Sequence, residues 1–430
     1  DLITEGRHPG TTGRMHRLVV DHLRKQNPQE TDLVNDFIIH RARKLGTDFT
    51  QAPELWEIDS ITDALLDILT RKPELLKQIP DFIRHVALNY VTDTRIAAML
   101  KNLTAHLSGT STQTSFLAHT LLGDVLQNTD PAQARESYQR SLAITRYLAE
   151  TWPEDLQARW GLAIALNNVA GMLKYSDPGR ALELYEESLG IRRGLDGRLL
   201  GDFRARRDLA ISLDNVAGML KYSDPGRALE LYEESLGISR DLDGRLLGDF
   251  RARRDLTVDL NNVAGMLRNS DPGRALGLYE ESLDIGRDLA GRLSGDVRAR
   301  RDLTVDLNNV AGMLENSDPG RALGLYEESL DISRDLAGRL PGNLQALWDL
   351  GVAAARLAQL LPTEDPERVS LWREAASSLR DALAIQPEHR ELARMSYYAA
   401  HRYVDCDPDD RDEWLAYAAE LAERFGFGKE

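Results

Sequence analysis

A six-residue string, DPGRAL, recurs at a constant interval in the central part of the chain. Its four copies begin at Asp177, Asp224, Asp271 and Asp318, so each starts 47 residues after the one before (224 − 177 = 47). A weaker copy, DPAQARESYQRSL, begins at Asp130, again 47 residues earlier (177 − 130 = 47). Such a chain must fold as an array, because one short unit cannot bury its own apolar surface and needs its neighbours to cover it.

Each unit predicts two amphipathic helices joined by a short turn. The first, over 206–222, places apolar side chains at helical spacing, and these are Leu209, Leu213, Val216, Ala217 and Leu220. The second begins at an Asp-Pro step, where Asp224 is expected to cap the helix and Pro225 to occupy its first turn. Its buried side is expected to hold Ala228, Leu229, Leu231, Tyr232, Leu236 and Ile238, and the loop DGRLLGDF, with Gly244 and Gly248, is expected to end it.

These residues resemble the tetratricopeptide repeat (TPR) family. In the second helix, Ala228, Tyr232, Ser235 and Leu236 fall at the family's spacing of alanine, aromatic, alanine and leucine, with serine in place of the second alanine. The first helix is similar over N-V-A-x-x-L, although Ala217 replaces the family's glycine. The interval exceeds the family's usual period of about 34 residues, and is similar to that of bacterial and kinesin-light-chain-like arrays. The resemblance covers about residues 113–425.

The resemblance implies an all-α fold, a right-handed superhelical solenoid of antiparallel helix pairs with an N-terminal helical domain. We expect the array over 116–387 and a C-terminal capping helix pair over 388–430. Residues 109–115, GTSTQTS, are expected to be a linker, because small hydroxyl residues without an apolar pattern favour a loop. Residues 1–108 do not follow the period, and two alternatives stand for them: a cap on the first repeat or a separate docking module.

Composition narrows the classes of partner and compartment. The formal net charge of −16 argues against a general nucleic-acid or anionic-membrane surface, because such surfaces need clustered lysines and arginines. The single cysteine, Cys406, cannot form an internal disulfide, which suits a reducing cytoplasm. No apolar run approaches the length of a membrane span. We therefore expect a soluble, cytoplasmic protein, and the start at Asp1 rather than Met suggests a trimmed segment or a larger parent.

The sequence offers little that resembles catalytic chemistry. No GxxxxGK[ST], HExxH or GxSxG string is present. The segment 8–14, HPGTTGR, lacks the lysine of a phosphate loop, and the acidic run at 405–412 lacks the glycine turn of a calcium loop. The nine histidines lie outside the near-identical repeats, and Cys406 has His401 five residues away on what should be the preceding helix. We expect no enzyme, no cofactor and no metal.

The candidate site is the side of each first helix opposite its apolar stripe, which in the resembled family lines the concave groove. Amides, cations and tyrosines recur there. Asparagine can donate to and accept from a peptide backbone, and lysine or arginine can bind a carboxylate. Glycines at 171, 218, 265 and 312 would leave room for a ligand or the next helix. The predicted groove residues are Asn167, Asn168, Lys174, Tyr175, Asp214, Asn215, Lys221, Tyr222, Asn261, Asn262, Arg268, Asn308 and Asn309.

Function is predicted from these features together. We expect a scaffold that binds a partner protein or peptide in the groove. Two alternatives are binding on the convex face and a purely structural role for the asparagines. The repeated RARRDL arginines are expected to pair with glutamates such as Glu233 and Glu234. By analogy with similar bacterial arrays, the partner would be an effector such as a caspase-like peptidase in signalling or antiphage defence. The alternative is the regulatory part of a larger enzyme whose catalytic domain is missing from this chain.

Overall fold

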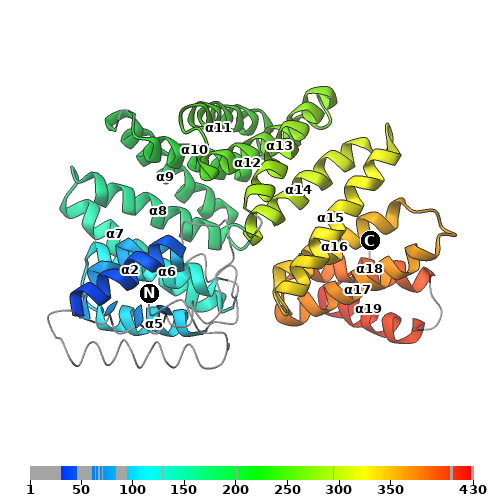
Figure 1. Cartoon of the computed structure of the whole chain (residues 1–430), viewed down its shortest axis with the longest axis horizontal. Helices are drawn as coiled ribbons and strands as arrows, with labels where there is room; N and C mark the ends of the chain where they lie inside the picture. The colour runs from blue at the N-terminus through cyan, green and yellow to red at the C-terminus, as the bar shows by residue number, and fades with distance from the viewer. Residues whose placement is uncertain are drawn as a thin grey trace. The chain divides into compact units, whose positions relative to one another are not determined.

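The computed structural model describes residues 31–45, residues 61–83 except 63, 66, 67 and 70, and residues 94–427 except 128, 200, 294 and 407–409. Throughout these ranges the regular structure is helical (Figure 1). The segment HPGTTGR lies outside them, as does part of the acidic run near the C-terminus. The predicted all-α class is confirmed.

The helices follow one another in antiparallel pairs, of which we call the first member helix A and the second helix B. Three elements precede the pairs: α2 (Thr31–Leu45), the 3-10 helix η2 (Pro73–Gln78) and α5 (Thr94–His106). The pairs are α6 (Gln113–Leu126) with α7 (Pro131–Thr151), α8 (Leu156–Leu173) with α9 (Pro178–Arg198), α10 (Phe203–Leu220) with α11 (Pro225–Arg245), α12 (Phe250–Leu267) with α13 (Pro272–Arg292), α14 (Val297–Leu314) with α15 (Pro319–Arg339), α16 (Leu344–Leu360) with α17 (Pro366–Ile385), and α18 (Arg390–Cys406) with α19 (Arg411–Phe425).

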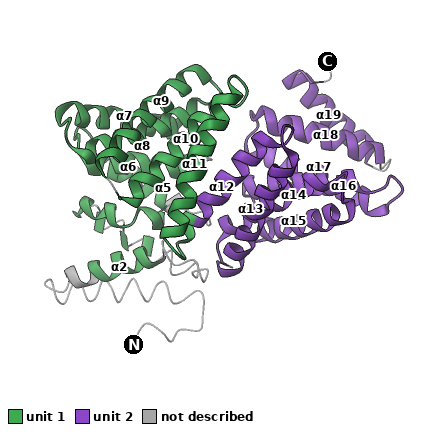
Figure 2. Ribbon diagram, turned by 90° about the horizontal axis from the view of Figure 1, so that it is seen from above, with its two compact units in different colours: residues 1–252 green, residues 253–430 purple. Residues whose placement is uncertain are grey.

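The chain divides into two compact units, unit 1 over residues 1–252 and unit 2 over residues 253–430 (Figure 2). In unit 1, consecutive helices from α5 to α11 pack on one another, and α6 also contacts α8. In unit 2, the same holds from α13 to α19. Each unit is therefore a stack of helix pairs, as expected for a helical repeat that shares its core with its neighbours.

The Asp-Pro steps begin the helices B as predicted. The side chains of Asp177, Asp224, Asp271 and Asp318 each accept a hydrogen bond from a backbone N–H three residues on. This capping satisfies a donor that the first turn of a helix leaves without a partner. The predicted ends of these helices were less accurate. Helix α11 continues through Gly244 to Arg245, and the turn comes at Gly248, whose φ of +83° suits glycine.

The core of each pair lies between helix A and helix B. The predicted apolar stripe of α10 is buried, as are Leu231, Tyr232 and Leu236 of α11. The serine that replaces the family's second alanine has a role of its own. In α9 and α11, the hydroxyls of Ser188 and Ser235 each donate to a helix A carbonyl at 3.0 Å. The buried serine is satisfied in this way, so the substitution does not leave an unpaired polar group in the core.

The N-terminal elements of unit 1 pack against the first pair. Both α5 and η2 contact α6. Residues 109–112 of the GTSTQTS segment lie in the turn between α5 and α6, where Gly109 has a φ of +79° and Thr112 caps α6. Residues 113–115, which were predicted as linker, are the first residues of α6. The assignment of this turn as a domain boundary stays a prediction. None of the described helices is both long enough and apolar enough to span a bilayer.

Candidate functional site

A line of side chains faces solvent along each helix A. On α10 it contains Arg204, Ile211 and Asn215, whose spacings of seven and four residues correspond to about two turns and one turn of helix. We call this line the outer stripe. The corresponding residues are Gln157, Ile164 and Asn168 on α8, Arg251, Val258 and Asn262 on α12, and Arg298, Val305 and Asn309 on α14.

The aliphatic member of the outer stripe is exposed, although it is a β-branched apolar residue in every copy. Exposure is 37% for Ile211, 42% for Val258 and 47% for Val305. Sequence reasoning missed these residues because it grouped apolar positions by the buried stripe alone. The signal was present in the sequence, since an aliphatic residue recurs at the same place in each unit but outside that stripe.

The second asparagine of each Asn-Asn pair belongs to the outer stripe. Asn168, Asn215 and Asn262 are half-buried, and their side chains make no hydrogen bond with any described residue. Each amide therefore has donors and an acceptor for a ligand. Asn309 differs, because its Nδ2 donates to Oδ1 of Asn261 at 3.1 Å.

On α8 and α12 the first position of the pair points instead toward the neighbouring helix A, because one residue along a helix turns the side chain by about 100°. Asn261 donates to Oδ1 of Asp306 at 2.6 Å, and Asn167 is 3.5 Å from the Ser212 hydroxyl. Asp214 and Asn308 occupy the same position on α10 and α14 and are half-buried. The structure thus separates the predicted asparagine set into outer-stripe residues and residues that join helices.

A buried carboxylate in unit 2 is held by this joining network. Oδ1 of Asp306 accepts from Asn261 and, at 2.7 Å, from the Ser282 hydroxyl, which links α14 to α12 and α13. Oδ2 has no hydrogen-bond partner, and the residue is 1% exposed. Burial raises the pKa of Asp306 to about 6, and the two hydrogen bonds oppose this while nearby Asp302 adds to it.

On α10, α12 and α14, arginines such as Arg206, Arg254 and Arg301 bind aspartates, and the predicted pairing of such arginines with the Glu-Glu step of helix B is wrong. Arg206 contacts Asp196 at 3.5 Å and Asp241 at 4.0 Å. Glu234 instead binds Arg193 of the preceding helix B at 2.9 Å. The reason is geometric. In an antiparallel pair the start of helix A lies beside the end of helix B, where Asp241 stands, whereas the glutamates lie in the middle of helix B.

Similar bonds join successive helices A. The Trp160 indole N–H donates to Asp208 at 2.5 Å, and Arg301 binds Asp349 at 2.6 Å. Asp208 also accepts from Arg192 at 2.9 Å. Burial lowers the pKa of Arg192 to about 10, with Asp208 acting in the opposite direction. These bonds connect neighbouring repeats within each unit.

The predicted cations and tyrosines lie where helix A turns into helix B. In unit 1, Tyr175 is 91% and Tyr222 is 90% exposed, and Lys174 and Lys221 each lie 5.7 Å from the centre of the adjoining ring. In unit 2 the equivalent Arg268 donates to the Gly312 carbonyl at 2.9 Å. The structure therefore leaves two exposed Lys-Tyr turns in unit 1, while Arg268 contacts the next helix A.

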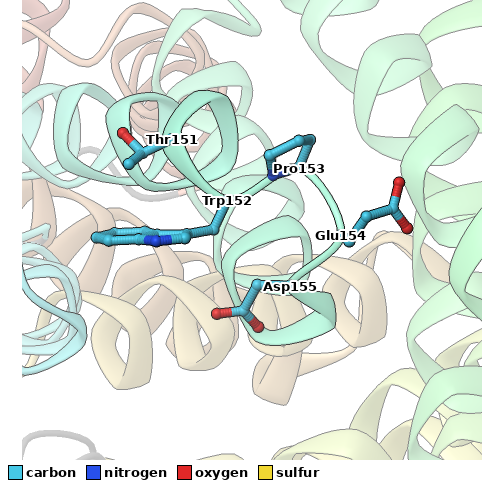
Figure 3. A pocket seen from close by; sticks show the side chains of 5 residues that line it. All are labelled: Thr151, Trp152, Pro153, Glu154 and Asp155. Atoms are coloured by element: carbon cyan, nitrogen blue, oxygen red, sulfur yellow. The ribbon is translucent and has the colours of Figure 1, made fainter.

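Other possible sites contribute little. Among the described residues, no group of three or more His, Cys, Asp or Glu side chains is placed to hold a metal ion. Cys406 is a half-exposed free thiol, and the ring of His401 packs on Tyr397. A surface hollow next to the turn between α7 and α8 is lined by 151–155 alone, with Trp152 and Glu154 pointing to opposite sides (Figure 3). Side chains that diverge in this way do not form a catalytic centre.

Comparison with known proteins finds matches among solved structures alone. No family model and no curated protein matches the sequence. A Rap protein complexed with competence and sporulation factor is 12% identical, with 91% of this chain and 98% of that one covered and a TM-score of 0.49. An IFIT1 mutant with a capped RNA, m7Gppp-AAAA, is 12% identical over 91% and 79% of the two chains, with a TM-score of 0.43. The apo form of RapI is 10% identical over 84% and 99%, with a TM-score of 0.41.

At such identities no functional residue can be transferred to this chain. The architecture of paired helices fits a tetratricopeptide-like repeat, as the sequence resemblance implied.

Proposed function

We propose that this chain is a non-catalytic scaffold that binds an extended segment of a partner protein across the outer stripes of neighbouring helices A within one unit. One observation supports it above the others: an exposed aliphatic side chain recurs one turn before an asparagine, and three of these asparagines have no partner in the described chain. The aliphatic group gains free energy when a ligand side chain covers it. The amide can hydrogen-bond to the ligand's backbone, which would otherwise lose its bonds to water.

The spacing of the helices suggests the pattern of the ligand. Neighbouring packed helices lie about 8–10 Å apart, and an extended peptide rises about 3.3 Å per residue. About every third residue of the ligand would therefore reach the next outer stripe. We expect a segment with aliphatic or aromatic side chains at that interval.

The proposed contact residues follow from this arrangement. The outer-stripe asparagines contact the ligand, and the Lys-Tyr turns of unit 1 flank it. Asn167, Asn261 and Arg268 bond to a neighbouring helix A and hold it in place. The proposed ligand-contacting set is Ile164, Asn168, Lys174, Tyr175, Ile211, Asn215, Lys221 and Tyr222 in unit 1, and Val258, Asn262, Val305 and Asn309 in unit 2.

A peptide-display selection on the whole chain tests the proposal. Selected peptides are synthesised, and their Kd is measured by fluorescence anisotropy against the wild type and against the double variant Val258→Ser, Val305→Ser. Each valine is half-exposed, so covering it is worth about 1 kcal/mol and the double variant should bind about 30-fold more weakly.

The matched control is Leu247→Ser, which removes an aliphatic side chain that is 88% exposed in the α11–α12 turn and away from the outer stripes. It should leave the Kd unchanged. An equal Kd for the double variant and the wild type would disprove the proposal.

We propose more narrowly that the chain controls a bacterial effector, such as a caspase-like peptidase, in cytoplasmic signalling or antiphage defence. This narrower proposal rests on the family resemblance stated above. The Rap and IFIT1 structures hold competence and sporulation factor and m7Gppp-AAAA respectively, and those ligands belong to those proteins. Sequencing the complete reading frame tests the alternative of a regulatory part of a larger enzyme, which needs a catalytic domain on the same chain.

A further inference from the structure

An arginine stands at the start of the outer stripe on both α10 and α12. These residues, Arg204 and Arg251, occupy the same position in consecutive repeats and belong to unit 1. Both are exposed. We call them the arginine row.

One member of the arginine row already binds a carboxylate from a distant part of the chain. Nη2 of Arg251 lies 2.7 Å from Oδ2 of Asp81, although the two residues are 170 positions apart. Asp81 follows η2, and its neighbours Ile79, Phe82 and Ile83 are buried. Since η2 packs on α6, the Asp81 carboxylate belongs to a packed segment of unit 1 and not to a free tail.

The other member is oriented by an aromatic ring. The guanidinium of Arg204 lies 3.3 Å from the centre of the Trp160 ring. Stacking uses the flat face of the guanidinium, and its N–H groups lie in the plane, where they are arranged to bind carboxylates in pairs. This restraint reduces the side-chain entropy that the arginine would lose on binding.

The surrounding charge favours an acidic ligand on this side of unit 1. The helix α10 has three arginines and two aspartates, whereas α11 has three arginines and five acidic residues. In a chain with a net charge of −16, α10 therefore has a small net positive charge and α11 a net negative charge. Such asymmetry attracts an acidic segment to the helix A side and repels it from the other.

We infer that the partner segment carries carboxylates that bind the arginine row, and that Asp81 is an internal substitute for one of them, bound to Arg251 until the partner displaces it. This inference rests on the proposed function for the surface and adds the charge of the ligand. The Asp81–Arg251 pair is exposed, with 40% and 51% of the two side chains accessible, so it is weak enough to be exchanged.

Two synthetic peptides that share an aliphatic residue at every third position test the inference. One has glutamate at the remaining positions, and the other has glutamine. On the full-length chain, fluorescence anisotropy should give about tenfold tighter binding for the glutamate peptide, and this preference should shrink as salt is added. The double variant Arg204→Gln, Arg251→Gln should lose the preference.

A second variant tests the role of Asp81. Asp81→Asn frees Arg251, so it should tighten binding of the glutamate peptide by about two- to fivefold, the range expected for an exposed ion pair, and leave the glutamine peptide unchanged. The matched control is Arg193→Gln, which removes an arginine of the same 51% exposure from helix B, where it binds Glu234. It should change neither Kd.

The outcomes separate the two proposals. If both peptides bind equally well, or if the arginine-row variant keeps its preference, the inference is wrong while the proposed function stands. An unchanged Kd for Asp81→Asn overturns the displacement of Asp81. If neither peptide binds at millimolar concentration, the inference fails, and the display selection then decides the proposed function independently. Circular dichroism of each variant verifies that it folds.

Discussion

Asp306 is a buried residue whose ionisation affects the stability of unit 2. Its pKa is about 6 in the folded chain, against an ordinary value of 3.8, so the folded state binds a proton more tightly than the unfolded state between these two pH values. The contribution of Asp306 to stability is therefore greatest below about pH 4 and falls as the pH rises through 6. Linkage puts the loss from this residue at up to about 3 kcal/mol.

The variant Asp306→Asn should be more stable than the wild type above pH 6 and no more stable near pH 4. Both hydrogen bonds of Asp306 go to Oδ1, which an asparagine keeps, while the charge on the buried Oδ2 is removed. Urea unfolding at several pH values measures the difference. Asp331→Asn, at an exposed carboxylate that contacts Arg334 at 3.8 Å, provides the control. A stability gain that does not change with pH would contradict the assignment of the proton to Asp306.

At the scale of the helix, identical glycine substitutions should have opposite effects at two positions. A Cβ at Gly218, inside α10, would lie 3.4 Å from the Tyr232 hydroxyl, which is an ordinary contact. Gly218→Ala should thus raise stability by about 0.5–1 kcal/mol, because alanine favours the helix. The predicted role of the repeated glycines, to leave room for a ligand or a neighbouring helix, does not depend on this contact and stays a prediction.

Gly248→Ala should instead lower stability by about 1 kcal/mol, because the φ of +83° in the α11–α12 turn places a Cβ in the left-handed region. Thermal unfolding of the two variants, followed by circular dichroism, tests the pair. If both variants change the unfolding temperature in the same direction, the backbone conformation at Gly248 does not determine the effect of its substitution on stability.

At the scale of the whole molecule, helix pairs that contact only their neighbours should not lose stability together. Trp372 is fully buried in α17 of unit 2. Trp372→Ala should cost about 3–5 kcal/mol locally. Hydrogen exchange measured by mass spectrometry should then show faster exchange in α15 to α19 and little change in α7 to α9 of unit 1.

A reciprocal variant serves as the control for this experiment. Tyr138→Ala removes a buried aromatic ring from α7 and should produce the opposite pattern, with faster exchange in α6 to α9 and little change in α17. Equal loss of protection in both units after either substitution would mean that the molecule unfolds as one cooperative block.

The sequence alone determined the helices, their Asp-Pro starts and the side of each that is buried, because each of these depends on residues within one or two turns. It also identified the helix A surface as the candidate site. It misjudged where Asp241 and the glutamates lie relative to the arginines, and it missed Ile211, Val258 and Val305 because it treated apolar residues as core.

The tertiary structure decided that Asn167 and Asn261 bond to the next helix A, whereas the side chains of Asn168 and Asn262 make no hydrogen bond with a described residue. It also decided that Asp306 is buried and that Asp81 reaches Arg251. The physical reason is the same in each case. A difference of one residue turns a side chain by about 100°, and the direction in which the neighbouring helix then lies depends on packing between repeats, which no local pattern of residues specifies.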